Sequence, residues 1–331
     1  MVKRKSLEVI YEPIKKPKDP SVPDEAWRKM RDVIETTFLL KCPGDFFTFY
    51  EFCCKISPDE PLKALRDELD IELVGPFELL SRDWIPDASE DFSCCYRYFH
   101  DPPEFVTVFA APSGFYHVGY FRDDANDLPS FMASSDSSVD GRFEILGCDI
   151  FSVVAKLLNR RKGAKRARIL TEMQKFAVER SFRIDLKSTV KRDTVCPTLN
   201  SVGLRINLHN GIGYRPVPLS NSELVNLLQK IVQSTDAKTK VPHQAKLDEL
   251  VTLVQFANDE GDFGEGLELG LDLLAFHPKG ENLQSASCFN STISLLLSTG
   301  YQLAGRPQFA EVINRHMKNR CIEPTSLKTN S

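Results

Sequence analysis

Four neighbouring polar residues, Asn258, Asp259, Glu260 and Asp262, have side chains suited to ion binding or proton transfer. Carboxylate and amide oxygens bind Ca²⁺ in loops where such residues alternate with glycine. An acidic segment between two helices is also commonly a solvated turn without chemistry of its own. A carboxylate that a well-anchored turn presents in a fixed place can instead take part in catalysis. The residue types by themselves leave these three interpretations open.

The spacing of these residues does not fit a calcium site. An EF-hand loop needs acidic or amide ligands at positions 1, 3 and 5, glycine at position 6 and glutamate at position 12. A loop counted from Asn258 has Phe263 at position 6 and Leu269 at position 12. The glycine turn and the bidentate ligand are therefore both missing, and the calcium interpretation fails.

Apolar residues on each side predict that two helices hold the acidic segment. They follow helical spacing before it, at Leu247, Leu250, Val251 and Val254, and after it, at Leu267, Leu271 and Leu274. Glycines at 261, 264 and 266 make one continuous helix costly. We therefore predict helices near 243–257 and 266–276, joined by a tight acidic turn.

The segments VQFANDE at 254–260 and GLELGLDL at 266–273 closely resemble the histone PARylation factor family, accessory proteins of DNA-damage-activated poly(ADP-ribose) polymerases. Other segments resemble family sequences in the same order: LVGPFELL at 73–80, YRYFHDPPEF at 96–105, YHVGYFRD at 116–123 and GYR at 213–215. The resemblance extends from about Val33 to Arg320, with a poor match at 279–300. Motifs of this length are far more specific than a short glycine fingerprint.

The resemblance implies that the chain docks on a polymerase catalytic domain, which binds NAD, and completes a composite site that modifies serine on histones and other proteins. The family's catalytic glutamate corresponds to Glu260, the adjacent interface acid to Asp259, and the arginine lining the joint site to Arg215. Tyr214 is a further candidate for partner binding. Gly261 replaces a residue with a side chain in better-known members, so the turn is expected to be looser here, with Glu260 still in place.

A single glutamate could supply the base that another protein's active site lacks. The hydroxyl of serine is a poor nucleophile until a base takes its proton, and a glutamate with an ordinary pKa of ~4.3 is ionised at neutral pH. The chain has no GxGxxG after a strand, no P-loop, no G-x-S-x-G and no H-E-x-x-H. We therefore predict no bound cofactor, no metal and no turnover of NAD by this chain alone.

Two other classes of function remain open. One is an adaptor that binds polymerase or chromatin and contributes no catalytic group. The other is a self-sufficient hydrolase that uses Glu260 and Asp262 as paired carboxylates. Arg215 likewise has two interpretations: a contact to an acidic partner, or an ion pair within the chain.

Composition indicates an ordinary soluble globular protein. The chain has 331 residues, 42% of them hydrophobic and 27% charged, and a formal net charge of −4, which argues against nonspecific DNA binding by the whole surface. No apolar run approaches the ~20 residues of a membrane span, and no secretory signal is evident. Nine cysteines without a C-x-x-C pair fit free thiols in a reducing compartment. We expect a monomer.

The expected fold is α+β. Residues 1–25 form a disordered basic, proline-rich tail, with lysines that nuclear import machinery could read, and the family resemblance favours the nucleus and chromatin. Residues 26–150 form an N-terminal α/β domain with an antiparallel sheet. Residues 151–331 form a mostly helical C-terminal, polymerase-binding domain with a small β insertion.

Individual elements can also be predicted. Strands are expected near 95–100, 105–111 and 115–121, and around the turn within 190–206. Helices are expected from Asp24 through Glu35, from Pro43 to Lys55, from Phe151 to Arg161, and near 221–233, 283–299 and 306–318. The clustered aromatic residues of the second helix are expected in the core, and His100 and His117 are expected to be hydrogen-bonded within the sheet rather than metal ligands.

The densest group of positive charges lies at 160–168. One interpretation is a binding surface for an acidic partner, DNA or a growing ADP-ribose polymer. The other is the solvated face of a long helix that continues through Met173 and Phe176, which we favour. No aromatic residue is interleaved with these charges, so stacking on bases is not indicated.

Overall fold

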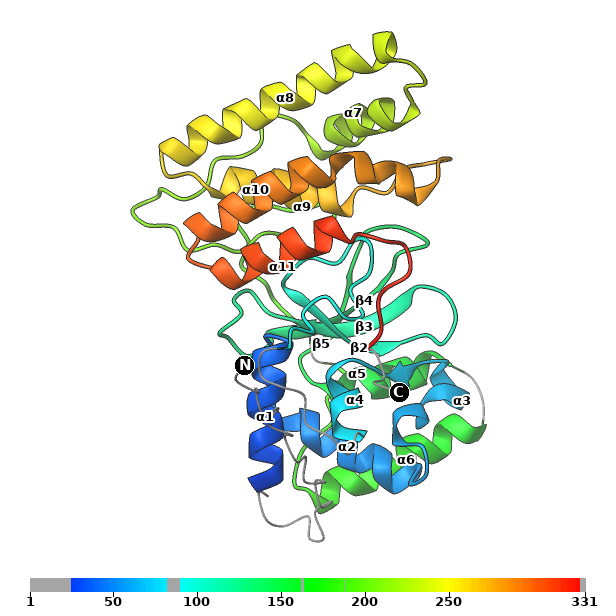
Figure 1. Ribbon diagram of the computed structural model, residues 1–331. Helices are drawn as coiled ribbons and strands as arrows, with labels where there is room; N and C mark the ends of the chain where they lie inside the picture. Colours follow the sequence, from blue (N-terminus) through cyan, green and yellow to red (C-terminus); the bar gives the residue numbers. More distant parts are fainter. Residues whose placement is uncertain (1–24, 82–89, 162–163, 188, 328–331) are drawn as a thin grey trace, which may run out of the picture.

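The computed structural model describes residues 25–81, 90–161, 164–187 and 189–327. Within these ranges a five-stranded antiparallel sheet lies between two groups of helices (Figure 1). This architecture confirms the predicted α+β class. None of the helices in these ranges is both long and apolar enough to cross a bilayer.

The sheet is a meander in which each strand pairs with the next along the chain. Its strands are β1 (Glu72–Leu73), β2 (Phe105–Ala110), β3 (Tyr116–Phe121), β4 (Phe131–Asp136) and β5 (Glu144–Gly147). All of β2, and all of β3 except Tyr116, is buried. Because helices cover both faces of the sheet, the side chains on both faces must be largely apolar. The sequences of β2 and β3 are therefore nearly continuous apolar runs. The strands predicted near 105–111 and 115–121 are confirmed.

The helices of the N-terminal half cover one face of the sheet, the lower face in Figure 1. They are α1 (Glu25–Thr37), α2 (Gly44–Ile56), a 3₁₀ turn η1 (Pro61–Lys63), α3 (Arg66–Leu69) and α4 (Pro76–Ser81). Their core is aromatic: the ring of Phe46 stacks on that of Phe77 with centroids 4.2 Å apart, and Phe49 packs edge-on against Phe109 of the sheet. The aromatic cluster predicted to be core is therefore confirmed as core. Asp24, the predicted helix cap, lies outside the described residues.

Two further helices, α5 (Ile150–Arg160) and α6 (Ala164–Glu179), complete this half. The basic segment 160–168 therefore spans the end of one helix and the start of another, instead of one long helix. Arg160 pairs with Glu144 at 2.6 Å, and Arg161 donates to the carbonyl of Leu69 at 3.4 Å. These intramolecular contacts favour a structural role for both arginines, and binding of polymer or DNA by this segment stays a prediction.

The helices of the C-terminal half lie over the opposite face of the sheet (Figure 1). They are α7 (Asn221–Gln233), α8 (Ala237–Asp259), α9 (Gly264–Ala275), a 3₁₀ turn η2 (Leu283–Phe289), α10 (Asn290–Leu303) and α11 (Pro307–Lys318). Each predicted helix of this half is confirmed. The one expected at 283–299 begins as the 3₁₀ turn, and α8 starts earlier than expected because the Asp236 side chain accepts from the backbone N–H of Thr239 at 2.9 Å.

The strand predicted at 95–100 is wrong, because these residues form turns. The backbone N–H of Tyr98 donates to the Asp101 carboxylate at 2.9 Å. Arg97 is buried and donates to the carbonyls of Ser93 and Phe105, each at 3.0 Å. Proline cannot donate to a strand ladder, so the following Asp-Pro-Pro sequence favours these local hydrogen bonds over pairing.

The strands predicted within 190–206 are also absent from the described residues. Only an isolated antiparallel bridge joins Cys196 to Leu204. The Thr198 hydroxyl hydrogen-bonds to the Asn200 side chain and accepts from the N–H of Gly203 at 3.0 Å, which closes a compact turn. Side-chain hydrogen bonds of this kind satisfy the backbone locally and compete with a ladder.

Buried polar contacts join the two halves. The Tyr301 hydroxyl on α10 donates to the buried Glu104 carboxylate at 2.8 Å. Arg320 donates to the carbonyls of Phe99 and Leu274 at 2.8 and 2.9 Å. The turn at 96–105 therefore connects the sheet to α9 and α10, while the predicted domain division at residue 150 stays a prediction. The predicted tail, apart from Glu25, lies outside the described residues.

His100 and His117 are both hydrogen-bonded, as expected, although only His117 lies in the sheet. His117 on β3 contacts the Asp101 carboxylate at 2.9 Å. His100 lies in the turn before β2 and donates to the carbonyl of Leu274 at 2.9 Å. Burial lowers the pKa of His100 to about 3, so this imidazole is neutral at physiological pH.

Candidate functional site

The acidic segment is a tight turn between α8 and α9, as predicted. Glu260 is the C-cap residue directly after α8, and its N–H donates to the carbonyls of Phe256 and Ala257, each at 3.1 Å. Gly261 has φ +92°, and the next N–H, that of Asp262, donates back to Ala257 at 2.7 Å. A glycine with positive φ just after a helix is a common C-terminal cap. Gly261 therefore suits this turn, and the backbone hydrogen bonds fix the carboxylate-bearing segment.

A second segment, residues 209–215, lies against this turn. An isolated bridge joins Tyr214 to Phe263, in which the N–H of Gly264 donates to the carbonyl of Gly213 at 2.8 Å. The Asp262 carboxylate accepts from the N–H of Gly213 at 3.0 Å. A Cβ at Gly264 would come within 2.7 Å of the Gly213 carbonyl oxygen, so only glycine permits this approach. The pairing brings residue 215 to the turn although the two are far apart in sequence.

Arg215 contacts both carboxylates of the turn. Its Nη2 forms an ion pair with Glu260 and lies 3.2 Å from Asp262. The Arg215 and Glu260 side chains are 44% and 60% exposed, so this pair faces solvent and contributes little to stability. The hydrogen bond to Glu260 raises the pKa of Arg215 and keeps the guanidinium charged. Two predicted site residues are thus brought together.

Tyr214 and Asp259 differ in their surroundings. The hydroxyl of Tyr214 donates to Glu268 on α9 at 3.1 Å, and burial raises the pKa of that phenol. The N–H of Val217 donates to the same carboxylate oxygen, also at 3.1 Å. Glu268 therefore anchors the chain on both sides of Arg215. Asp259, the last residue of α8, is exposed beside Glu260, and the roles of both residues in partner binding stay predictions.

Three carboxylates on α9, at Glu265, Glu268 and Asp272, are buried, and sequence reasoning did not single them out. Asp272 accepts from the N–H of Leu199 at 2.7 Å. Burial raises the pKa of Asp272 to about 7 and that of Glu265 to about 6, although the nearby Arg215 opposes the shift of Glu265. Their i, i+3, i+7 spacing places all three on one side of an otherwise apolar helix. This was the sequence signal that could have identified them as a group.

A second missed feature is an exposed apolar face on α8. The predicted stripe is buried at Leu247, Leu250 and Val254. Leu253 and Phe256 lie beside that stripe and are 39% and 59% exposed. Phe256 is four residues before Glu260, so both side chains share one helix face. The departure of these residues from the buried stripe was visible in the sequence.

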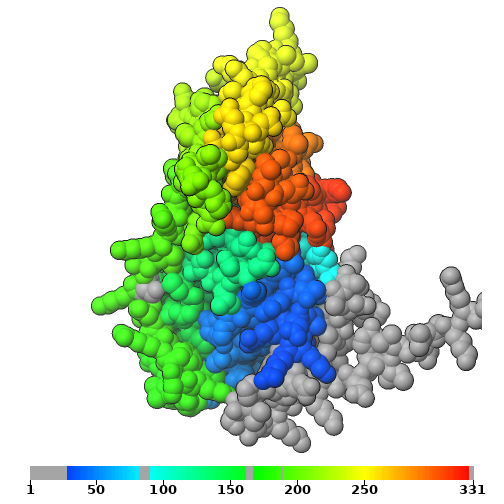
Figure 2. Space-filling model, turned by 90° about the vertical axis from the view of Figure 1, so that its left-hand side faces the viewer, coloured from blue at the N-terminus to red at the C-terminus, as the bar shows by residue number. Residues whose placement is uncertain are grey.

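Helix α8 lies at the end of the helical half that is farther from the sheet (Figure 1). In Figure 2 the yellow α8 lies above the orange and red segments that carry α10 and α11.

The family model described as histone PARylation factor 1 matches residues 29–320 of the chain. The chain belongs to this family.

Individual relatives match over nearly the same extent. Histone PARylation factor 1 of Danio rerio is 31% identical over 307 residues, covering 88% of this chain and 86% of the relative. That of Bos taurus is 30% identical over 308 residues, covering 88% and 87%. A Homo sapiens protein named putative histone PARylation factor 1-like is 26% identical over 317 residues, covering 88% and 86%.

Metal binding has no support from the described side chains, among which no three His, Cys, Asp or Glu residues are grouped to hold an ion. The acidic turn agrees with this, because its Asp262 oxygens contact Gly213 and Arg215. The expectation that the chain holds neither metal nor cofactor stays a prediction.

Proposed function

We propose that the chain docks on the catalytic domain of a poly(ADP-ribose) polymerase and supplies Glu260 as the general base for serine ADP-ribosylation. The polymerase binds NAD. Glu260 takes the proton from the acceptor serine, the serine oxygen attacks the anomeric carbon, and nicotinamide leaves. Histones are the proposed main acceptors, and the proposed site of action is damaged chromatin in the nucleus. In this proposal the chain is a monomer that turns over no NAD alone.

The observation that carries the proposal is an exposed glutamate on an anchored turn. The Glu260 side chain is 60% exposed, whereas its backbone is held by hydrogen bonds of α8 and by the segment paired at Phe263. A general base must reach within hydrogen-bond distance of its proton in a fixed geometry. An exposed carboxylate on a turn held by backbone hydrogen bonds meets that need for a substrate bound by another protein.

The surroundings of Glu260 also suit docking. Leu253 and Phe256 are exposed on the same side of α8, and Ile212 is 52% exposed beside Gly261. Exposed apolar side chains grouped next to charged residues are typical of protein interfaces. Asp259 and Arg215 add charges of both signs at this edge, which can set the register of a partner.

The adaptor alternative is favoured by one observation. Arg215 pairs with Glu260, so part of the carboxylate is occupied in the isolated chain. In the composite-site proposal the acceptor serine competes with Arg215 for Glu260, or acidic groups of the partner attract Arg215. The hydrolase alternative lacks support, because Glu260 and Asp262 contact one nitrogen of Arg215 instead of flanking a substrate across a cleft.

The test combines the chain with a polymerase catalytic domain, NAD and a serine-containing histone peptide. Glu260→Gln keeps the shape of the side chain but removes its basicity. We expect serine modification to fall by roughly 10²–10⁴-fold, as is usual on loss of a general base, while pull-down of the polymerase is unchanged. If the chain is an adaptor, the Glu260→Gln variant retains serine modification. If it is a hydrolase, the unmodified chain releases nicotinamide or ADP-ribose in the absence of polymerase.

A further inference from the structure

Arg215 holds Glu260 and Asp262 through one nitrogen only. Its Nη2 forms the ion pair with Glu260 and lies 3.2 Å from one oxygen of Asp262. The other oxygen of Asp262 accepts from the N–H of Gly213 at 3.0 Å, which fixes this carboxylate. A guanidinium has five N–H donors, and the Nε and Nη1 donors of Arg215 have no acceptor among the described residues. Arg215 can therefore keep Asp262 and exchange Glu260 for another carboxylate.

Glu265 is a carboxyl group placed for that exchange. It is 2% exposed and lies in the first turn of α9, where its N–H donates to the carbonyl of Asp262 at 3.2 Å. Its side chain forms no hydrogen bond or ion pair with any residue that the structure describes. Buried carboxylates are normally hydrogen-bonded or paired. A buried acid without a partner and a cation with free donors thus both lie next to Asp262.

The charges of Arg215 and Glu265 act on each other. Burial raises the pKa of Glu265 to about 6; the Arg215 guanidinium opposes this rise, and the carboxylates of Glu268 and Asp262 reinforce it. In return, Glu265 adds to the raised pKa of Arg215, of which the hydrogen bond to Glu260 is the largest cause. Glu265 is therefore mostly ionised above about pH 6, and in that form it attracts the guanidinium.

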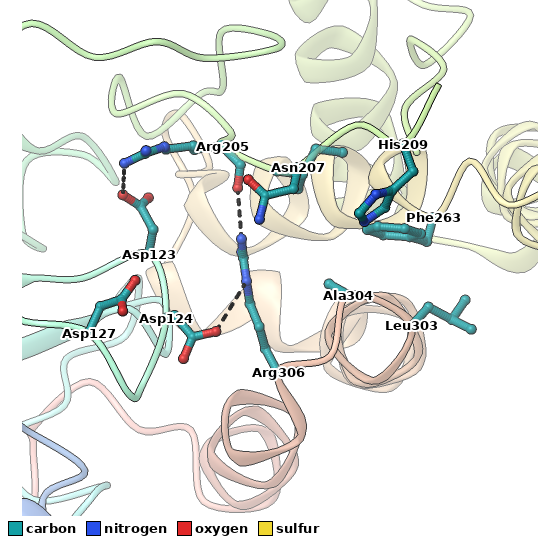
Figure 3. Close-up of a pocket in the computed structure, with 11 residues that line it drawn as sticks. Asp123, Asp124, Asp127, Arg205, Asn207, His209, Phe263, Leu303, Ala304 and Arg306 are labelled. Carbon is teal, nitrogen blue, oxygen red and sulfur yellow. Dashed lines mark hydrogen bonds and ion pairs between the residues drawn. The ribbon is translucent and has the colours of Figure 1, made fainter. Parts of the chain in front are cut away.

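A neighbouring polar cavity offers Arg215 no further partner. The cavity has a volume of about 280 Å³ and is lined by the loop after β3, the α10–α11 junction and Phe263 (Figure 3). Its carboxylates, at Asp123, Asp124 and Asp127, all come from that loop, and Arg215 is not among the residues that line it. The described carboxylates that act on Arg215 are therefore those of the acidic turn and of the first turn of α9.

We propose that Glu265 is a positioning residue that draws Arg215 away from Glu260 and so frees the general base for the acceptor serine. Asp262 is the fixed point of this movement, because Gly213 holds it while the guanidinium turns. The proposal rests on the proposed function, since it explains how Glu260 becomes available for that reaction. One ion pair replaces another, and no covalent bond forms or breaks.

The state of Glu265 decides which ion pair is favoured. When Glu265 is protonated it offers no charge, and the guanidinium stays on Glu260 as in the described structure. When Glu265 is ionised, its attraction for Arg215 competes with that of Glu260. Ion pairs near a protein surface differ little in strength, so the exchange changes the populations of the two states by about fivefold.

The first test uses the chain alone and follows the NMR signal of the Arg215 Nε–H group. We expect this signal to shift between pH 5 and pH 8 with a midpoint at about 6, and we expect the transition to disappear in Glu265→Gln. Histidine side chains titrate in the same range, and His209 lies on the adjoining segment, so His209→Gln is the control and should keep the transition. An Arg215 signal that ignores pH over this range, or a transition that persists in Glu265→Gln, would overturn the proposal.

The second test measures serine transfer at saturating polymerase and NAD. We expect Glu265→Gln to lower kcat at pH 7.5 about fivefold and to abolish the rise of kcat around pH 6. Glu265→Asp restores the charge and should restore part of kcat. In an Arg215→Ala background, Glu265→Gln should have no further effect, because its partner is already gone. An equal loss in that background would show that Glu265 acts without Arg215, and the proposal would be wrong.

The two tests separate this proposal from the proposed function. If serine transfer does not depend on Glu260 but the Arg215 signal still follows Glu265, the composite site is wrong and the pairing of Arg215 with Glu265 stands. If transfer depends on Glu260 but the Arg215 signal ignores Glu265, the proposed function stands and this proposal fails. Urea denaturation at pH 7.5 provides the folding control: Glu265→Gln removes a buried charge and should be at least as stable as the unmodified chain.

Discussion

The carboxylates at the end of α8 and those on α9 are close in sequence and opposite in environment. The Glu260 side chain is 60% exposed, and its partner among the described side chains is Arg215, itself an exposed residue. Glu265 and Asp272 are each 2% exposed, and Asp272 accepts from a backbone N–H. The same residue types are therefore available for chemistry at one place and serve to fasten the chain at the other.

The buried set supports the exposed one. Glu268 accepts from Tyr214 and Val217, the residues that bracket Arg215, and so fixes the position from which Arg215 reaches Glu260. Burial opposes the charged form of a carboxyl group unless hydrogen bonds compensate. The contrast predicts that substitutions at Glu260 change the reaction rate and substitutions on α9 change stability.

The largest expected effect is on the rate at Glu260. Glu260→Ala should lower serine transfer by roughly 10²–10⁴-fold, yet leave the free energy of unfolding within about 0.5 kcal/mol, because an exposed side chain leaves no cavity. Reconstituted transfer assays and urea denaturation measure the two quantities. Glu249→Ala is a matched control, since Glu249 is exposed on α8, the helix that precedes Glu260, and should change neither quantity. A large loss of stability in Glu260→Ala would break the contrast.

Glu268 should show the opposite behaviour. Glu268→Ala removes the acceptor for two donors, and buried donors left unpaired cost about 1–3 kcal/mol each, so the free energy of unfolding should fall by roughly 2–6 kcal/mol. Glu268→Gln keeps an acceptor oxygen, so its loss of stability should be less than half of that in Glu268→Ala. Thermal and urea denaturation of both variants provide the comparison. Equal destabilisation by Ala and Gln would mean that the hydrogen bonds are not the cause.

The buried carboxyls should also make stability depend on pH. Burial raises the pKa of Asp272 from 3.8 to about 7 and that of Glu265 from 4.5 to about 6. Between the ordinary pKa of each group in the unfolded chain and its raised pKa in the folded chain, the folded chain binds more protons than the unfolded chain. The free energy of unfolding therefore falls as pH rises. We expect a loss on the order of 2 kcal/mol from pH 5 to pH 8, measured by urea denaturation. Asp272→Asn should flatten this slope, and an unchanged slope would contradict the assignment.

The smallest effect concerns Arg215. Arg215→Ala should weaken polymerase binding about tenfold, or roughly 1.4 kcal/mol, because a charge at the docking edge is lost, whereas folding should be nearly unaffected by removal of an exposed pair. Titration calorimetry measures the affinity, and Arg215→Lys should retain part of it. The same affinity in Arg215→Ala and the unmodified chain would leave Arg215 with only its contacts to Glu260 and Asp262.

Periodic helices were the part of the fold that sequence predicted best. The helix expected at 221–233 has the bounds Asn221–Gln233, with the Ser220 and Glu223 side chains forming a capping box. Helical spacing and caps are local properties, so they can be recognised without the rest of the chain. The strand predicted at 95–100 failed because Arg97 is buried and hydrogen-bonds to the nearby carbonyls of Ser93 and Phe105, which the alternation of β-prone tyrosines does not reveal.

The sequence by itself determined the turn and the identity of its carboxylates. Dense glycine between two apolar stripes ends α8 at Asp259 and starts α9 at Gly264, which leaves Glu260 on the connection. Only the tertiary structure decided what surrounds that glutamate. Segments distant in sequence decide whether Arg215 contacts Glu260, whether Phe256 is exposed and whether Asp272 is buried. The reason is that packing, and not residue spacing, sets the environment of a side chain.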